Sequence, residues 1–182
     1  MPSDLRQDLR KTRTQKQLRQ ALISLLNEKP YNKINVQEIC DTAMINTSTF
    51  YRHFYGKSEL AGVMIAEFKT EFEQIQQYAR SCERLSEFNS EQTARLFELR
   101  HSLLALWKID TPRHHLYQDM FASIQQQLRL FVAKQNKTCS EFQTILFATT
   151  ILTVMKYYFE RNLPVPAQEL FDEWQGVLDF VV

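Results

Sequence analysis

Residues 31–60 read YNKINVQEICDTAMINTSTFYRHFYGKSEL, and this stretch decides the fold of the amino-terminal part of the chain. It holds two short amphipathic segments, each too short to be stable as an isolated helix. Asn35 and Asn46 are placed to cap them. Only Met44 and Ile45 separate the first segment from the second cap, so the two helices must cross steeply. This pattern is typical of a helix-turn-helix, whose second helix enters the major groove of DNA.

The apolar residues of both segments fall on one side. The expected inner faces comprise Val36, Ile39, Cys40 and Ala43 in the first segment and Phe50 and Phe54 in the second. The rest of the second segment offers hydroxyl, phenol and basic groups that can meet bases or phosphates. These candidate DNA-binding residues are Thr47, Ser48, Thr49, Tyr51, Arg52 and His53. Gln37 and Lys57 join them because each lies near an expected helix N-terminus, where phosphates bind well.

Charge is divided unevenly along the chain. Residues 1–57 hold ten lysines and arginines against five acidic residues, whereas residues 58–182 hold twelve against sixteen. A basic amino-terminal segment followed by an acidic segment is typical of a module that binds a polyanion, joined to a part that the polyanion repels. We call the basic segment, residues 1–57, the head. The first helix is expected at about 9–28, and an amino-terminal basic arm adds charge for neighbouring phosphates. The arm comprises Arg6, Arg10, Lys11, Arg13, Lys16 and Arg19.

Beyond residue 57, apolar residues recur at every third or fourth position. The stripes run over Leu60 to Cys82, Leu96 to Trp107, Tyr117 to Phe131, Phe142 to Tyr158 and Ala167 to Val181. No strand-like alternation of useful length interrupts them, and only three glycines occur in the chain. The predicted fold class is therefore all-α, with an amino-terminal three-helix domain followed by a larger helical domain.

Composition narrows the class of protein further. Of 182 residues, 44% are hydrophobic and 24% are charged, as in ordinary globular proteins. The least polar run, Phe142 to Met155, is shorter than the roughly 20 residues that span a bilayer, and the amino terminus does not resemble a secretory signal. Cys40, Cys82 and Cys139 are odd in number and far apart, which suits reduced thiols. We expect a cytoplasmic protein with no membrane partner.

Motifs for catalysis or metal binding are absent from the sequence. His101, His114 and His115 have no cysteine or carboxylate partner at a usual ligand spacing. Neither a nucleophile elbow nor an HExxH sequence is present, and the glycine count excludes a glycine-rich phosphate loop. We therefore predict no enzymatic activity, no metal and no cofactor.

The sequence resembles the TetR family of transcriptional regulators. The shared pattern comprises Ala43, the turn Met44 and Ile45, then Thr49, Phe50, Tyr51, His53, Phe54 and Lys57 before a long helix, and it covers about a third of the chain. The remainder resembles the family only in its helical layout. Met44 stands where the family often has glycine, which strains the backbone if a left-handed conformation is needed. Asn46 replaces the usual serine cap, and asparagine caps equally well.

The resemblance implies DNA contacts at Gln37, Thr47, Ser48, Thr49, Tyr51, His53 and Lys57. It also implies a DNA-binding domain at residues 1–57 and an effector-binding and dimerisation domain at residues 58–182. The expected function is that of a repressor, bound as a homodimer to a palindromic double-stranded DNA operator and released by a small-molecule effector. Helices at about 140–162 and 167–181 are the expected dimer interface, because both are richly apolar.

Two further questions stay open at the level of sequence. Candidates for lining an effector pocket are Trp107, Tyr117, Phe121 and Phe147, although aromatic residues at helical spacing are also typical of a plain core. The alternative functions are a helical adaptor or coregulator that pairs with another protein and has lost operator binding, and a helical enzyme.

Overall fold

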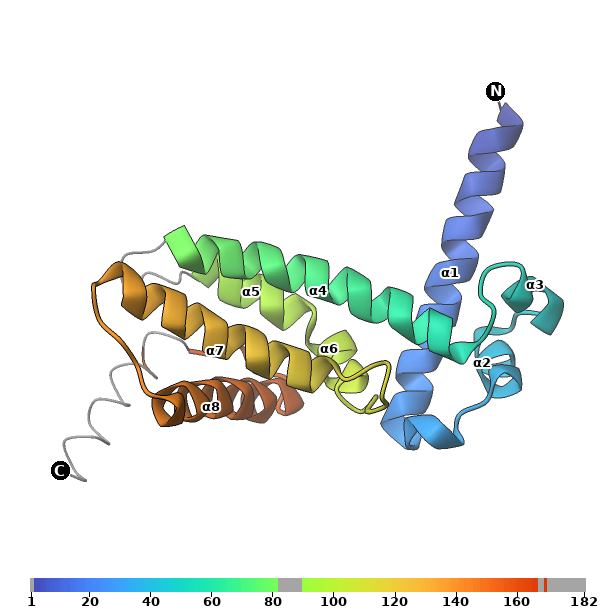
Figure 1. Ribbon diagram of the computed structural model, residues 1–182. Helices are drawn as coiled ribbons and strands as arrows, with labels where there is room; N and C mark the ends of the chain where they lie inside the picture. The colour runs from blue at the N-terminus through green and yellow to red at the C-terminus, as the bar shows by residue number, and fades with distance from the viewer. Residues whose placement is uncertain (1, 82–89, 167–168, 170–182) are drawn as a thin grey trace. The chain divides into compact units, whose positions relative to one another are not determined.

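The computed structural model describes residues 2–81, 90–166 and 169 (Figure 1). In chain order, the elements are α1 (Pro2–Glu28), the 3-10 helix η1 (Tyr31–Lys33), α2 (Val36–Ala43), α3 (Thr47–Tyr51), α4 (Lys57–Ser81), α5 (Ser90–Glu98), α6 (Arg100–Leu106), α7 (Leu116–Lys134) and α8 (Glu141–Glu160). The described part of the chain contains no β-strand beyond an isolated bridge between Asp110 and His115. The predicted all-α class is confirmed.

By packing, the chain divides into two compact units. The first comprises the described residues up to Phe68 together with Ala105–Leu116, and the second comprises the described residues of Lys69–Leu104 and those from Tyr117 onward. Helix α4 begins in the first unit and continues into the second. The predicted domains were defined by function, so their boundary at residues 57 and 58 stays a prediction.

Helix α1 carries the first unit's core on its carboxyl-terminal half. Leu18, Leu22, Leu25 and Leu26 are buried at helical spacing, whereas residues 8–13 are all exposed. The helix begins at Pro2, earlier than the predicted residue 9. Proline is favourable at the first helical position, and Leu5, Arg6 and Gln7 are good helix formers. In Figure 1 the amino-terminal part of α1 extends beyond α2 and α3, so the basic arm is the start of a helix that projects from the unit.

The interior of the first unit is completed by α2, α3 and the start of α4. Ile39, Cys40 and Phe50 are buried there, as the two inner faces predicted. Arg19 of α1 also binds the carboxylate of Glu67 on α4, with an N to O distance of 2.6 Å. The two short helices are therefore stabilised by the hydrophobic contacts of their neighbours and not by their own length.

The single apolar stripe predicted from Leu96 to Trp107 is two helices. Helix α5 ends at Glu98, and α6 begins at Arg100. The guanidinium of Arg100 donates to the carbonyl of Phe97 at 2.8 Å and to Asn162 Oδ1 at 2.7 Å. The bond to Phe97 satisfies a carbonyl at the end of α5, where the backbone has no helical partner. The apolar spacing of three or four residues continues across the break between α5 and α6, so periodicity alone does not predict the break.

Helix α8 has apolar residues on both its buried and its exposed face. A capping box formed by Ser140 and Gln143 starts the helix. Its buried face is made of Thr144, Ala148, Leu152, Met155 and Phe159. Its large exposed apolar residues are Phe142, Ile145, Leu146, Ile151 and Tyr157. The helix predicted at 167–181 lies outside the described residues. None of the described helices combines the length and apolar character required to cross a membrane.

Candidate DNA-binding site

Both asparagines predicted to be helix caps are caps in the structure. Asn35 Oδ1 accepts from the backbone N of Glu38 at 2.9 Å, and Glu38 Oε2 accepts in return from the N of Asn35 at 2.9 Å, completing a capping box. Lys29 forms an ion pair with Glu38. Asn46 Oδ1 accepts from the N of Ser48 at 2.9 Å. These bonds start α2 and α3 at Val36 and Thr47 and so fix which side chains face outward.

The turn between α2 and α3 depends on a strained residue. Met44 adopts the left-handed conformation, with φ 54° and ψ 43°, and its side chain is 93% exposed. Its backbone N donates to Asp41 O at 3.1 Å, and the N of Ile45 donates to Cys40 O at 2.9 Å. A residue with a β-carbon is disfavoured there relative to glycine. The turn therefore contains the left-handed conformation for which the sequence predicted strain at Met44.

Helix α3 presents its polar side chains to solvent over a buried aromatic residue. Phe50 is fully buried, and the Tyr51 ring packs edge-on against it with centroids 5.5 Å apart. Tyr51 is nevertheless 56% exposed, so more than half of the residue is accessible. Thr47 and Thr49 are half-buried, and Ser48 is exposed.

Two basic side chains flank the end of α3. Arg52 is exposed, and its guanidinium donates to Thr49 Oγ1 at 2.9 Å. His53 is half-buried, and its Nδ1 is buried without a hydrogen-bond partner. Burial, together with the positive charges of Lys11 and Arg52, lowers the pKa of His53. Cationic groups from α1 and from the end of α3 therefore lie near one another, as a site for a phosphate requires.

Gln37 and Lys57, the two predicted residues outside α3, have different surroundings. Gln37 is exposed on α2, and its Nε2 donates to Asp41 Oδ1 at 2.7 Å. Lys57 is half-buried, and its Nζ donates to the backbone carbonyls of Tyr31 at 2.9 Å and Ile34 at 2.5 Å. Burial lowers the pKa of Lys57. Lys57 therefore holds the segment before α2 in place, and its predicted contact with DNA stays a prediction.

One exposed aromatic residue near this surface was missed by sequence reasoning. Tyr55 follows the buried Phe54 in the loop before α4, and its side chain is 93% exposed. Its backbone N donates to Glu59 Oε2 at 2.5 Å, which fixes the loop. Tyr55 belongs to none of the apolar stripes, so the sequence pattern offers no reason to expect it in the core. An exposed position could have been predicted from that pattern. We add Tyr55 to the candidate DNA-binding residues.

The geometry of this site agrees with a comparison against known families. Residues 18–64 match the family model described as bacterial regulatory proteins, tetR family. The matched segment is a TetR-family helix-turn-helix domain. The resemblance inferred from the sequence is thereby confirmed over this segment, and the chain is a DNA-binding transcriptional regulator that carries a TetR-type DNA-binding domain. The match extends from Leu18, a buried residue of α1, to Met64 on α4.

Comparison with solved structures found a chain described as the dihydroxyacetone kinase operon activator DhaS. The TM-score is 0.49 at 18% sequence identity, and the alignment covers 91% of this chain and 93% of that chain. A comparison with curated protein sequences found no match.

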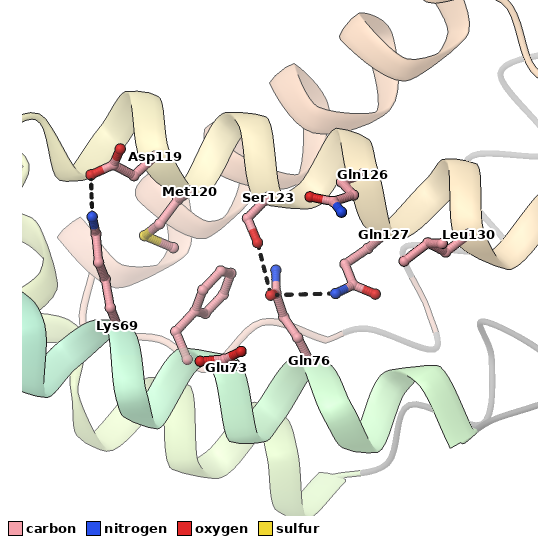
Figure 2. Close-up of a pocket in the computed structure, with 10 residues that line it drawn as sticks. Lys69, Glu73, Gln76, Asp119, Met120, Ser123, Gln126, Gln127 and Leu130 are labelled. Atoms are coloured by element: carbon pink, nitrogen blue, oxygen red, sulfur yellow. Dashed lines mark hydrogen bonds and ion pairs between the residues drawn. The ribbon is translucent and has the colours of Figure 1, made fainter.

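The second unit of this transcriptional regulator contains a cavity between α4 and α7. Its volume is about 350 Å³, and Figure 2 shows its lining. Lys69 and Asp119 pair across it at 2.5 Å. Gln76 Oε1 accepts from Ser123 Oγ at 2.8 Å and from Gln127 Nε2 at 3.5 Å. The remaining lining residues are Phe72, Glu73, Met120, Gln126 and Leu130.

None of the four aromatic residues predicted to line an effector pocket borders this cavity. Trp107, Tyr117, Phe121 and Phe147 are all half-buried. Trp107 belongs to the first unit, and the other three belong to the second. Their proposed role in effector binding stays a prediction. Within the described residues, no three His, Cys, Asp or Glu side chains are grouped as a metal site would need.

Proposed function

We propose that this protein is a repressor that binds a palindromic operator as a homodimer and releases it when a small-molecule effector binds. The observation that carries the proposal is the capped α2–α3 pair, whose outer face offers Ser48, Tyr51 and Arg52 to solvent over the buried Phe50. Such a face fits the major groove, and the neighbouring cations suit phosphates. As a transcriptional regulator, the protein would act in the cytoplasm.

A homodimer is supported by the exposed apolar face of α8. Phe142 is 71% exposed, and Ile145, Leu146, Ile151 and Tyr157 are exposed on the same helix. Soluble proteins rarely leave so many large apolar side chains of one helix in water unless they form an interface. Phe142, Leu146 and Tyr157 lie within about 60° of one another around the helix, so pairing of two α8 helices would bury these three together, as in helical bundles. On a palindromic operator, the two recognition helices of a homodimer would lie about 34 to 36 Å apart, one turn of DNA.

The cavity between α4 and α7 supports an effector of polar character. Its volume lies in the range of about 300 to 1,000 Å³ that small-molecule sites occupy. Four amide or hydroxyl side chains, Gln76, Ser123, Gln126 and Gln127, line it. A ligand that takes the hydrogen bonds of Gln76 would replace the bonds joining α4 to α7. Because the same α4 begins in the helix-turn-helix unit, such a change could shift operator affinity.

Selection of bound sequences from random duplex DNA tests the proposal. We expect a symmetric enriched site, since a homodimer presents two identical heads. Affinity for that site should fall with salt, with a log-log slope of about −0.9 per neutralised phosphate. Tyr51→Ala should weaken binding about tenfold or more if it contacts the groove, in line with the roughly 1 to 3 kcal/mol of a good base contact.

A matched pair of charge variants separates specific contact from general charge. Arg52→Ala at the end of α3 should reduce the salt slope by about one phosphate contact. Lys137→Ala, exposed in the loop after α7, should leave the slope unchanged. If no duplex is retained at low ionic strength, operator binding is excluded and the adaptor alternative is favoured. Binding without symmetry in the enriched site would exclude the palindromic dimer.

A further inference from the structure

The first turn of α4 is bound to three separate segments of the chain by three consecutive residues. Lys57 donates to the carbonyls of Tyr31 and Ile34 ahead of α2. Glu59 accepts from the backbone N of Tyr55 in the loop after α3. Ser58, between them, is joined to a residue far along the sequence: its Oγ lies 3.0 Å from Nε2 of His114. This turn therefore fixes both ends of the helix-turn-helix.

His114 belongs to a rigid segment between α6 and α7. The segment folds on itself, since the N of His114 donates to Thr111 Oγ1 at 3.0 Å and the N of Thr111 donates to His114 O at 2.9 Å. Leu106, Ile109 and Leu116 around it are almost fully buried. The imidazole of His114 is therefore held by a loop that its own hydrogen bonds and buried neighbours keep in place.

A second anchor holds the same segment against α1. The ammonium of Lys108 donates to the carbonyl of Leu26 at 3.1 Å and to Asn27 Oδ1 at 3.0 Å. Both acceptors lie in the last turn of α1, where carbonyls lack helical partners and a cation is favourable. By packing, Ala105–Leu116 belongs to the same compact unit as the helix-turn-helix.

Gly62 explains how closely His114 approaches α4. A β-carbon at Gly62 would lie 2.9 Å from Cε1 of His114 and 3.5 Å from its Nε2. Ser58 and Gly62 are one helical turn apart, so the ring lies over this turn and bonds to one residue while resting on the other. Glycine is disfavoured inside helices relative to alanine, and contact with the imidazole gives a physical reason for its presence here.

We propose that His114 is a positioning residue for DNA binding: packed on Gly62 and bonded to Ser58, it sets the first turn of α4 and thereby the placement of the helix-turn-helix. The inference rests on the proposed function, because its consequence is measured as operator affinity. His114 lies two residues before α7, which carries Asp119, Ser123 and Gln127 of the cavity. Through the contact of His114 with Ser58 and Gly62, the segment that leads into α7 would thus influence the placement of the helix-turn-helix.

A double-mutant cycle tests the contact, with the duplex recovered by selection as the probe. Gly62→Ala favours helix but displaces the imidazole, so we expect its DNA affinity to fall about tenfold, within the usual range of coupling between sites. His114→Ala should lose a similar factor. In the double variant the alanine methyl occupies space that the ring has left, so its affinity should be no lower than that of His114→Ala alone.

Gly56→Ser is the matched control. It adds a side chain where nothing lies within 4 Å, and serine is a favourable residue before a helix. Its affinity should equal that of the unaltered protein. Losses that multiply in the double variant, or single variants that bind DNA normally, would overturn the proposal.

Hydrogen exchange supplies a readout that does not need DNA. Gly62→Ala should speed amide exchange in residues 35–54, and the double variant should restore it at least partly. Exchange changes confined to α4 and to residues 105–116 would contradict a positioning role. If the unaltered protein retains no duplex while exchange behaves as expected, the proposed function fails and the contact stands.

Discussion

At the scale of single residues, Met44 shows that the turn geometry is imposed by its neighbours. Its φ of 54° is unfavourable for a residue with a β-carbon. The surrounding contacts, in which Ile39, Cys40 and Phe50 are buried, outweigh that cost. The capping bonds of Asn35 and Asn46 also stabilise the two helices that the turn joins. The left-handed conformation therefore persists with methionine at position 44.

Met44→Gly should therefore stabilise the protein. Relief of the left-handed strain, partly offset by the greater freedom of glycine in the unfolded chain, leaves about 1 kcal/mol. That corresponds to a rise in Tm of about 2 to 4 °C for a chain of this size. Thermal unfolding measures it. Asn136→Gly is the matched control, since Asn136 also has a positive φ of 55° but asparagine tolerates it. An equal gain at both positions would contradict the explanation.

His53 gives a second prediction at this scale. Burial, together with Lys11 and Arg52, lowers its pKa in the folded protein, whereas the unfolded chain titrates near the ordinary value of about 6.5. As the pH falls below that value, the unfolded state takes up a proton first, so stability declines until the folded pKa is reached. His53→Gln should flatten this decline. Urea unfolding from pH 7.5 to 5.5 measures it, and parallel curves for the two proteins would refute the assignment.

At the scale of elements, the start of α4 has a structural role that its sequence position did not indicate. Lys57 follows a loop and precedes a long helix, which is a favourable place for a phosphate contact. In the structure its ammonium instead serves two backbone carbonyls and lies 4.6 Å from the centroid of the Tyr31 ring. Lys57 therefore holds the recognition unit together, and its contact with DNA stays a prediction.

Lys57→Met should lower the free energy of unfolding by about 1 to 2 kcal/mol, because two carbonyls lose a charged donor at a half-buried site. Lys33→Met, an exposed lysine of the neighbouring 3-10 helix, is the matched control and should change stability little. Denaturant unfolding distinguishes them. If Lys57→Met unfolds like the unaltered protein yet loses DNA affinity, then its ammonium acts chiefly on phosphate.

The sequence predicts those elements whose causes are local. Caps at Asn35 and Asn46, the buried Phe50 and the seven-turn α4 all follow from short-range patterns, and each is found. Contacts between distant segments have no such pattern. His114 was considered only as a metal ligand, since nothing near it in sequence points to Ser58 or Gly62. The break at Leu99 and the cavity lining likewise depend on tertiary partners such as Asn162 and Gln76.

At the scale of the whole molecule, the uneven distribution of charge along the chain agrees with DNA binding by its amino-terminal part. The basic residues of α1 and the end of α3 belong to the unit that carries the TetR-family domain. The acidic excess lies in residues 58–182, which include α8 and its exposed apolar face. Because a polyanion repels that part, DNA contact is directed to the head.

The proposed dimerisation through α8 would determine how strongly the molecule binds a full operator. Replacing Leu146 by Glu places a charge on the exposed apolar face of α8, so the sedimenting mass at micromolar concentration should fall from that of two chains to one. Ala133→Glu, exposed on α7, is the control and should leave the mass unchanged. Two joined heads gain about 10² to 10⁴ in avidity over one, so Leu146→Glu should lose at least a hundredfold for the full palindrome while binding a half-site normally. Equal losses on both duplexes would show that the substitution damages the head, and an unchanged mass would place the dimer interface elsewhere.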